Sequence, residues 1–359
     1  MIALPTLEPL LLVLAFVLGA ALALATGGSR FCIYGALSDA SRRLPSPRLA
    51  GWLVAIAVAA LATALLQAGG LIDTADSLYA SPRLPWLGHT AGGLLFGIGM
   101  VYAEGCGLRN LTKAGGGDLD AALAILAIGL AAFMTMKGIL ALPRVWWIEP
   151  VAFRLPAAQT LGALLAQAGA SRWIAPVILL AAIAVLLRGG AAALSREALW
   201  RGSAVGGLVV AGWLLSGVLG HLTEHPDTLE EVYLRTGSGR MESLSFVGPL
   251  AQGLEWLLWG SDGSRTLTLG TLAALGVLAG SALGGKQALA IPADRTRTRR
   301  HLAGGLMMGT GGVLGLGCSV GQGITGLSTL ALGSFLTVGG MVAGALLALR
   351  RRPQSACTG

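Results

Sequence analysis

Charged residues are scarce in this chain. Only 12% of its 359 residues are Asp, Glu, Lys or Arg, and the mean hydropathy is +0.74. Such a composition excludes an ordinary soluble domain. The few charges still sum to +8. In so apolar a chain, this basic excess indicates which loops face the cytoplasm, and it does not favour nucleic-acid binding.

Cysteine is also rare. The four cysteines form no C-x-x-C pair and have no Cys/His ligand spacing. This pattern excludes a zinc site and a disulfide framework, and we expect no metal or cofactor. Basic residues are absent before Arg30, so the N-terminal apolar stretch lacks the basic region of a secretory signal. We therefore predict that it is a membrane span. The positions of the basic loops further along the chain predict that the N-terminus lies outside.

Long apolar runs are abundant instead. Many are about 17–25 residues long, which is the length needed to cross a bilayer, and they show no period-two alternation. The sequence therefore predicts an all-α polytopic membrane protein. We expect two short re-entrant or interfacial segments at 29–40 and 241–259. The nine expected crossings are 7–25, 49–70, 90–116, 119–142, 173–187, 202–220, 268–285, 302–327 and 329–349.

One apolar stretch occurs twice. Residues 92–106 recur at 304–318, a constant offset of 212, with eight of fifteen positions identical and both copies ending in Gly-Cys. The match predicts an internal repeat. Because glycine destabilises a helix interior, the glycines around each cysteine predict a broken helix in both copies.

The order of crossings predicts inverted repeats. Four crossings fall in each copy, and the single crossing between them reverses the second copy. Basic loops at 42–48, 286–300 and 350–352 then face the cytoplasm, as does the C-terminus. Inverted repeats with broken helices are typical of transporters. The predicted divisions are a first repeat at 1–142, an outer loop and linking helix at 143–201, a second repeat at 202–350 and a polar tail at 351–359.

The two repeated turns have chemistry that suits an anion. The start of each short half-helix would present free N–H groups and partial positive charge. Neutral thiols there suit a soft sulfur-containing anion. The alternative is a purely structural role in close helix packing, in which cysteine is only a small apolar residue. The substrate-path candidates from the two turns are Gly105, Cys106, Gly107, Asn110, Gly317, Cys318, Ser319 and Gln322.

Two ionisable residues flank the first turn. Glu104 and Arg109 are functional candidates because ionisable groups inside membranes usually have a role. A mutual ion pair near a membrane face is an equal alternative, since their repeat partners are Leu316 and Gly321. We expect His89 and His301, at the starts of the two repeated helices, to lie at the membrane interface.

Three motifs resemble those of the YeeE/YedE family of bacterial inner-membrane proteins. They are Ser-Arg-Phe-Cys-Ile-Tyr-Gly-Ala at 29–36, Glu-Gly-Cys-Gly-Leu-Arg-Asn at 104–110, and Gly-Leu-Gly-Cys-Ser-Val-Gly-Gln-Gly at 315–323. The resemblance implies an hourglass-shaped helical protein of the inner membrane. It also implies that Cys32, Cys106 and Cys318 are central thiols that pass thiosulfate along by S–H···S contacts.

The sequence thus predicts a permease for thiosulfate or a closely related small sulfur anion, and no enzyme activity. Two alternatives stay open: a transporter of a selenium species, sulfite or another small anion, and a membrane thiol–quinone oxidoreductase, which would need cysteines able to form a disulfide. The resemblance also allows a separate cytoplasmic sulfur-carrier protein as a partner.

Overall fold

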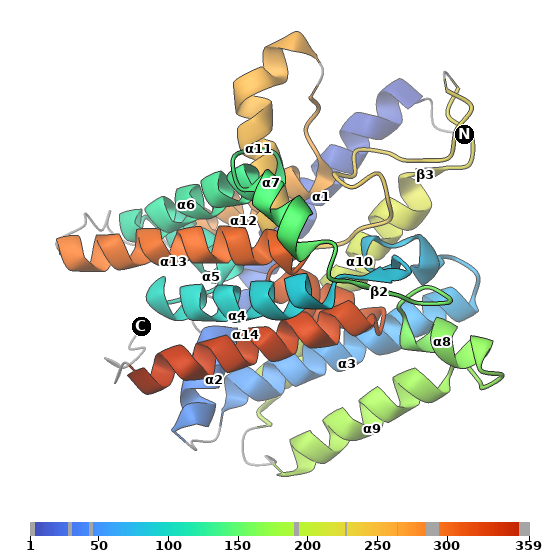
Figure 1. The fold of residues 1–359 in the computed structure, drawn as a ribbon, viewed down its shortest axis with the longest axis horizontal. Coiled ribbons are helices and arrows are strands. Elements are labelled where there is room, and N and C mark those ends of the chain that lie inside the picture. Colours follow the sequence, from blue (N-terminus) through green and yellow to red (C-terminus); the bar gives the residue numbers. More distant parts are fainter. Residues whose placement is uncertain are drawn as a thin grey trace.

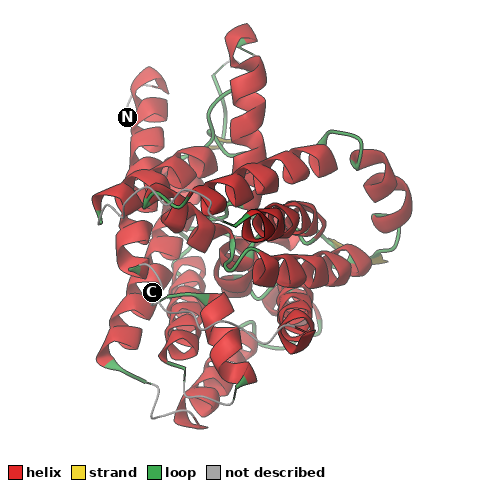
Figure 2. Cartoon of the chain, turned by 90° about the vertical axis from the view of Figure 1, so that its left-hand side faces the viewer, coloured by secondary structure: helices red, strands yellow, loops and turns green. Residues whose placement is uncertain are grey.

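The chain folds into a bundle of helices (Figure 1). The computed structural model describes residues 4–27, 31–42, 46–189, 194–226, 228–263, 265–284 and 294–351. Most of the expected basic loop around Lys286 and the tail with Cys357 lie outside these residues. Figure 2 shows that helices joined by short loops make up nearly all of the described chain.

The first half of the chain contributes a long helix, a short helix and another long helix before the first repeated stretch. Its elements are α1 (Leu4–Thr26), α2 (Ile33–Ser41), α3 (Pro47–Ala68), η2 (Thr74–Asp76), η3 (Leu78–Ala80), β1 (Arg83–Leu84), α4 (Trp86–Tyr102), α5 (Gly107–Gly115), α6 (Leu119–Met136), α7 (Ala141–Pro143), η4 (Arg144–Ile148), β2 (Phe153–Arg154) and α8 (Leu161–Gln167).

The second half follows a similar order. Its elements are α9 (Ile174–Gly189), α10 (Arg196–Leu214), η6 (Leu215–Leu219), β3 (His221–Leu222), β4 (Val232–Tyr233), α11 (Val247–Trp259), η7 (Gly260–Asp262), α12 (Leu269–Leu283), α13 (Arg295–Leu314), η8 (Gly321–Gly326) and α14 (Leu332–Arg351). Among the described residues, the named strands form two short antiparallel pairs, β1–β2 and β3–β4.

The all-α membrane class predicted from composition is confirmed at this level. Six segments of the described chain are long and apolar enough to cross a membrane: Thr6–Thr26, Pro47–Ala68, Trp86–Gly115, Leu119–Met136, Arg196–Leu219 and Leu332–Arg351. Two other apolar helices, Ile174–Arg188 and Leu269–Leu283, are shorter than these six.

Helices α4 and α13 both end in the same kind of turn. After α4, Glu104 adopts a left-handed conformation with φ of 51°, and the Gly105 N–H donates to the Met100 carbonyl at 3.0 Å. After α13, Leu316 has φ of 56°, and the Gly317 N–H donates to the Gly312 carbonyl at 2.7 Å. This Schellman pattern stops a helix while satisfying its last carbonyls. It normally uses glycine at the left-handed position, where both turns here have larger residues.

Helices α4 and α13 cross in direct backbone contact. A Cβ added to Gly92 would lie 2.6 Å from the Gly311 carbonyl oxygen, and one added to Gly99 would lie 2.6 Å from that of Gly304. The two contacts exchange under the 212-residue offset, since 92 corresponds to 304 and 99 to 311. Figure 1 shows α4 lying between α13 and α14. Glycine permits this approach because no side chain separates the backbones.

Candidate functional site

Each cysteine within the described residues immediately precedes a short helix. Cys32 comes before α2, Cys106 before α5, and Cys318 before the helical segment 319–328. Each cysteine carbonyl accepts the N–H four residues later, at 2.9 Å from Ala36, 2.9 Å from Asn110 and 2.7 Å from Gln322. All three are therefore helix N-cap residues, located at the positive end of a helix dipole.

The three thiols are buried and close together. They are unoxidised, and their residues are 5%, 2% and 0% exposed in chain order. The Cys106 thiol is near enough to Cys32 and to Cys318 to interact electrostatically with both, and it faces the Ser319 hydroxyl. The fold therefore brings residues from three distant parts of the sequence into one buried region. This juxtaposition includes Cys32, which lies outside the repeated stretch.

Cys318 has polar neighbours of its own. The Gly321 N–H donates to its sulfur at 3.4 Å, and the Ser245 Oγ lies 4.0 Å from that sulfur. Buried Tyr79, whose ring packs edge-on against Trp213, is also an electrostatic neighbour.

The sequence interpretation missed Ser245. A comparison of the two halves could have found it. If Gly35 is matched with Gly248, Ser245 occupies the position that Cys32 has in the first half. The Cys32–Cys106 pair of the first half thus corresponds to a Ser245–Cys318 pair in the second. One sulfur is replaced by oxygen, a smaller and harder hydrogen-bonding atom.

Two amide side chains brace the turns. Asn110 Nδ2 donates to the carbonyls of Gly105 and Cys106, at 2.9 and 3.1 Å. Gln322, 212 residues later, donates from Nε2 to the Gly315 carbonyl at 2.7 Å. The amide oxygens of both residues and the Ser319 hydroxyl are buried with no hydrogen-bond partner in the described part of the chain. These atoms remain available to a bound polar group.

The glycines of the turns have different roles. A Cβ on Gly105 would lie 2.7 Å from the Arg109 side chain, and Gly317 has φ of 158°. Gly107 differs, because a Cβ built there meets no atom within 4 Å although the residue is buried. Unfilled space therefore adjoins the first turn of α5, directly after Cys106.

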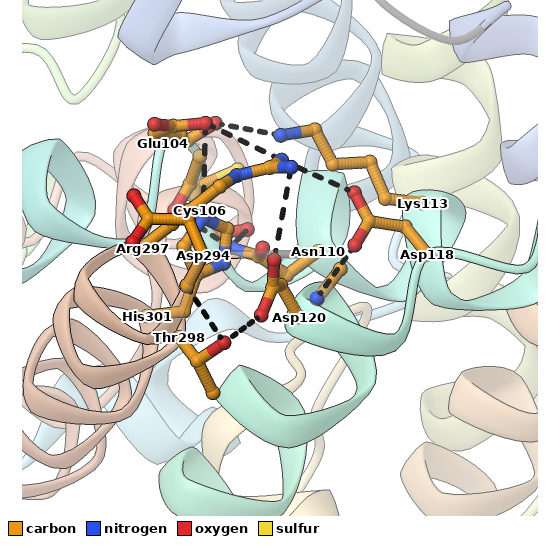
Figure 3. A network of polar contacts seen from close by, with 12 residues as sticks. Glu104, Cys106, Asn110, Lys113, Asp118, Asp120, Asp294, Arg297, Thr298 and His301 are labelled. Atoms are coloured by element: carbon orange, nitrogen blue, oxygen red, sulfur yellow. Dashed lines mark hydrogen bonds and ion pairs between the residues drawn. The ribbon is translucent and has the colours of Figure 1, made fainter. Parts of the chain in front are cut away.

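The carboxylate of Glu104 points to α13, and Figure 3 shows this network beside Cys106 and Asn110. Its Oε2 lies 3.6 Å from Arg297 and 3.7 Å from His301. Arg297 also contacts Asp118 at 3.5 Å and Asp120 at 3.7 Å. The alternative of a mutual Glu104–Arg109 pair is therefore not the arrangement found. The turn is joined instead to the helix that starts the second repeated stretch.

Lys113 joins this network to the thiols. Its Nζ donates to the Glu104 carbonyl at 3.2 Å, and the ammonium group is an electrostatic neighbour of Arg109 and of Cys32. A cation thus interacts with both the acidic turn and the first cysteine.

His89 and His301, which the sequence predicts at the membrane interface, are buried between helices. Their exposed fractions are 2% and 0%. Helices α4 and α13 pack against each other and against α14 and α6, so their early turns lie inside the bundle. The burial of the two histidines could not be predicted from their positions at the starts of helices, because it depends on which helices lie beside them.

Comparison with known proteins identifies a family and two relatives. The pattern of the sulphur transport family matches residues 28–347. A protein of Spirochaeta thermophila named thiosulfate transporter TsuA is 29% identical over 286 residues, 74% of this chain and 78% of that protein. A protein of Escherichia coli strain K12 with the same name is 26% identical over 328 residues, 85% of this chain and 84% of that protein. With its membrane-spanning helices, this chain belongs to the sulphur transport family.

Proposed function

We propose that this protein is a multi-pass membrane permease that imports thiosulfate or a closely related small sulfur anion. The observation that carries the proposal is the meeting of three buried cysteines, each capping the start of a short helix. Helix starts attract anions through their free N–H groups and dipole. Thiols add soft, weak hydrogen bonding that suits a terminal sulfur atom. The two relatives named as thiosulfate transporters support the same substrate.

The contacts suggest an ordered path. Ser245 lies 4.0 Å from the Cys318 sulfur, and electrostatic interactions link Tyr79 with Cys318, Cys106 with both Cys318 and Cys32, and Lys113 with Cys32. An anion that moves along this series would exchange one N-cap thiol for the next without any covalent step. The space beside Gly107 lies at the middle of the series.

We further propose the architecture of two inverted repeats with nine crossings. The reciprocal glycine contacts of α4 and α13 support it, because a two-fold relation exchanges the contact of Gly92 with Gly311 and that of Gly99 with Gly304. The matching left-handed residues Glu104 and Leu316 support it too. Such an arrangement places a substrate site where the repeats meet.

The basic residues at the start of α13 support an orientation with that end in the cytoplasm and the N-terminus outside. Lys113 and Glu104 would then lie on the inner side of the cysteines, and Tyr79 on the outer side. Reporter fusions after Arg48 and after Pro226 test this. We expect the first to be cytoplasmic and the second extracytoplasmic.

The growth of a sulfur-auxotrophic host on thiosulfate as sole sulfur source tests the function. We expect the intact protein to restore growth, and Cys106→Ala combined with Cys318→Ala to abolish it while the protein still reaches the membrane. Cys357→Ala, in the tail, is the matched control and should leave growth unchanged. Failure of the expressed wild-type protein to support growth would contradict thiosulfate as the substrate. Rescue by the double variant would contradict a path through the thiols.

The enzyme alternative makes a different prediction. An oxidoreductase would cycle Cys106 and Cys318 through a disulfide, whereas a permease keeps all three thiols reduced. Alkylation of membranes during active uptake, followed by mass analysis, distinguishes the two. A reversible Cys106–Cys318 disulfide would overturn the permease mechanism.

A separate cytoplasmic sulfur-carrier protein is a further proposal, and it rests on the family resemblance. Reconstitution of the permease alone in vesicles tests whether the carrier is needed. Thiosulfate uptake that proceeds without any added protein would show that the carrier is dispensable for transport.

A further inference from the structure

His301 is an unusual buried residue. Its exposed fraction is 0%, and neither ring nitrogen has a hydrogen-bond partner in the described part of the chain. The Glu104 Oε2 atom lies 3.7 Å from Nε2, which is within ion-pair range but beyond hydrogen-bond range. Burying an imidazole without a partner is costly, and such groups often have a function.

The backbone holds His301 beside this carboxylate. One turn further along α13, a Cβ on Gly304 would lie 2.6 Å from both the Ala103 nitrogen and the Gly99 oxygen. Helix α13 therefore touches the end of α4 directly, and Glu104 is the next residue along the chain. The histidine and the carboxylate cannot move far apart unless this helix contact opens.

The charges around His301 come from every neighbouring element. The α4–α5 turn contributes Glu104, helix α5 contributes Lys113 and Arg109, the start of α6 contributes Asp118 and Asp120, and the start of α13 contributes Asp294 and Arg297 (Figure 3). A proton on His301 therefore adds one positive charge to this cluster, whose member Glu104 is two residues from Cys106.

The first repeated helix, α4, offers an internal comparison. His89 stands 212 positions before His301 and is also buried, but its Nδ1 lies 2.8 Å from the Thr337 hydroxyl. The residue that corresponds to Glu104 in its half is Leu316. Of these two histidines, His301 is therefore the one that has a carboxylate beside it, able to form an ion pair with a protonated ring.

We propose that His301 is a proton-binding site, and that its protonation strengthens the binding of thiosulfate at the Cys106 turn. The inference rests on the proposed function. A positive charge added to the cluster attracts a dianion, which stays doubly charged over the pH range in which histidine titrates. By linkage, a bound anion must increase proton binding at His301 to the same degree.

Binding measurements on the purified full-length protein test this proposal. We expect radiolabelled thiosulfate to bind the wild type about fivefold more tightly at pH 5.5 than at pH 8. His301→Gln, which cannot carry a proton, should bind with an affinity that is nearly constant across this range. Glu104→Gln should bind more tightly than the wild type at pH 8, because it removes a negative charge from the same cluster.

His89→Gln is the matched control and should keep the wild-type pH profile. An unchanged pH profile in a monodisperse His301→Gln protein would overturn the proton site. Absence of thiosulfate binding by the wild type at every pH would instead contradict the proposed function.

A second measurement needs no variant. Calorimetric titration of the wild type with thiosulfate at pH 6.5, in two buffers of different ionisation enthalpy, reports the protons taken up on binding. We expect net proton uptake. Identical heats in the two buffers would contradict the proposal even if the His301 variants failed to fold.

Discussion

At the scale of single residues, the position before a short helix is the recurrent feature. The three cysteines occupy it, and their carbonyls accept the first helical hydrogen bond in each case. Ser319 follows Cys318, and its buried hydroxyl has no partner among the residues that the structure describes. These residues turn helix starts into polar surfaces inside an apolar bundle, where an anion gains most from N–H donors.

Gly107 gives a residue-scale prediction. We expect Gly107→Leu to abolish thiosulfate uptake while leaving thermal stability within about 1 kcal/mol of the wild type. A Cβ at this position meets no protein atom within 4 Å, so a side chain can enter the space beside Cys106, and leucine suits a helix better than glycine. Uptake into vesicles and a detergent melting curve measure the two effects.

Gly207→Leu is the control for this experiment, because Gly207 is equally unobstructed but exposed on α10. It should leave uptake unchanged. Normal uptake by a stable Gly107→Leu protein would exclude this space from the path.

At the scale of elements, a hydrogen bond to a carboxyl group connects the loop that follows α3 with the β3–β4 hairpin. Asp76, at the end of η2, accepts a hydrogen bond from the Tyr233 hydroxyl of β4, and the isolated bridge of Ser77 with Met241 lies beside it. Burial, and then the neighbouring Asp73 carboxylate, raise the pKa of Asp76. The folded loop therefore favours the protonated form of Asp76.

This shift predicts a small pH dependence of stability. Since the folded pKa is raised, the stabilisation is fully present below the unfolded pKa of Asp76 and is lost as pH rises through the folded value. We expect Asp76→Asn to remove this loss and to raise stability at neutral pH, by less than about 1 kcal/mol because Asp76 is exposed. Melting curves between pH 4 and 8 measure the slope.

Glu224→Gln, which removes an exposed carboxylate from the neighbouring loop, is the control and should retain the wild-type slope. If Asp76→Asn keeps that slope as well, another group is responsible for the pH dependence.

At the scale of the whole molecule, the crossing of α4 and α13 unites the two halves. Its four glycines allow backbone contact, and this contact places each turn against the other half. The Glu104 network and the cysteine cluster both depend on it, because their members come from both halves of the chain.

Gly99→Ala tests this dependence. The added Cβ would lie 2.6 Å from the Gly304 carbonyl oxygen, so the helices must separate. We expect a loss of about 1–3 kcal/mol in stability, as for other overpacked cores, together with reduced uptake. Gly339→Ala, on an unobstructed and exposed position of α14, should be neutral or slightly stabilising. Equal melting temperatures for the two variants would contradict a close crossing.

Several features could be predicted from the sequence because they depend on local chemistry. Apolar runs predict helices in a bilayer, and glycine beside cysteine in both repeated stretches predicts where those helices stop. The breaks before Gly107 and at Cys318 follow that prediction. The helical class needs no tertiary information, since backbone groups in lipid must be paired within their own segment.

Other features were decided only by tertiary structure. The Glu104 carboxylate joins Arg297 and His301 across about 190 residues of sequence instead of pairing with Arg109. Ser245 approaches Cys318, and His89 and His301 are buried between helices. Each outcome depends on which helix lies opposite, and that follows from the glycine crossing of α4 with α13. The sequence by itself determined the helices and their breaks, while the packing of the two halves determined which side chains meet there.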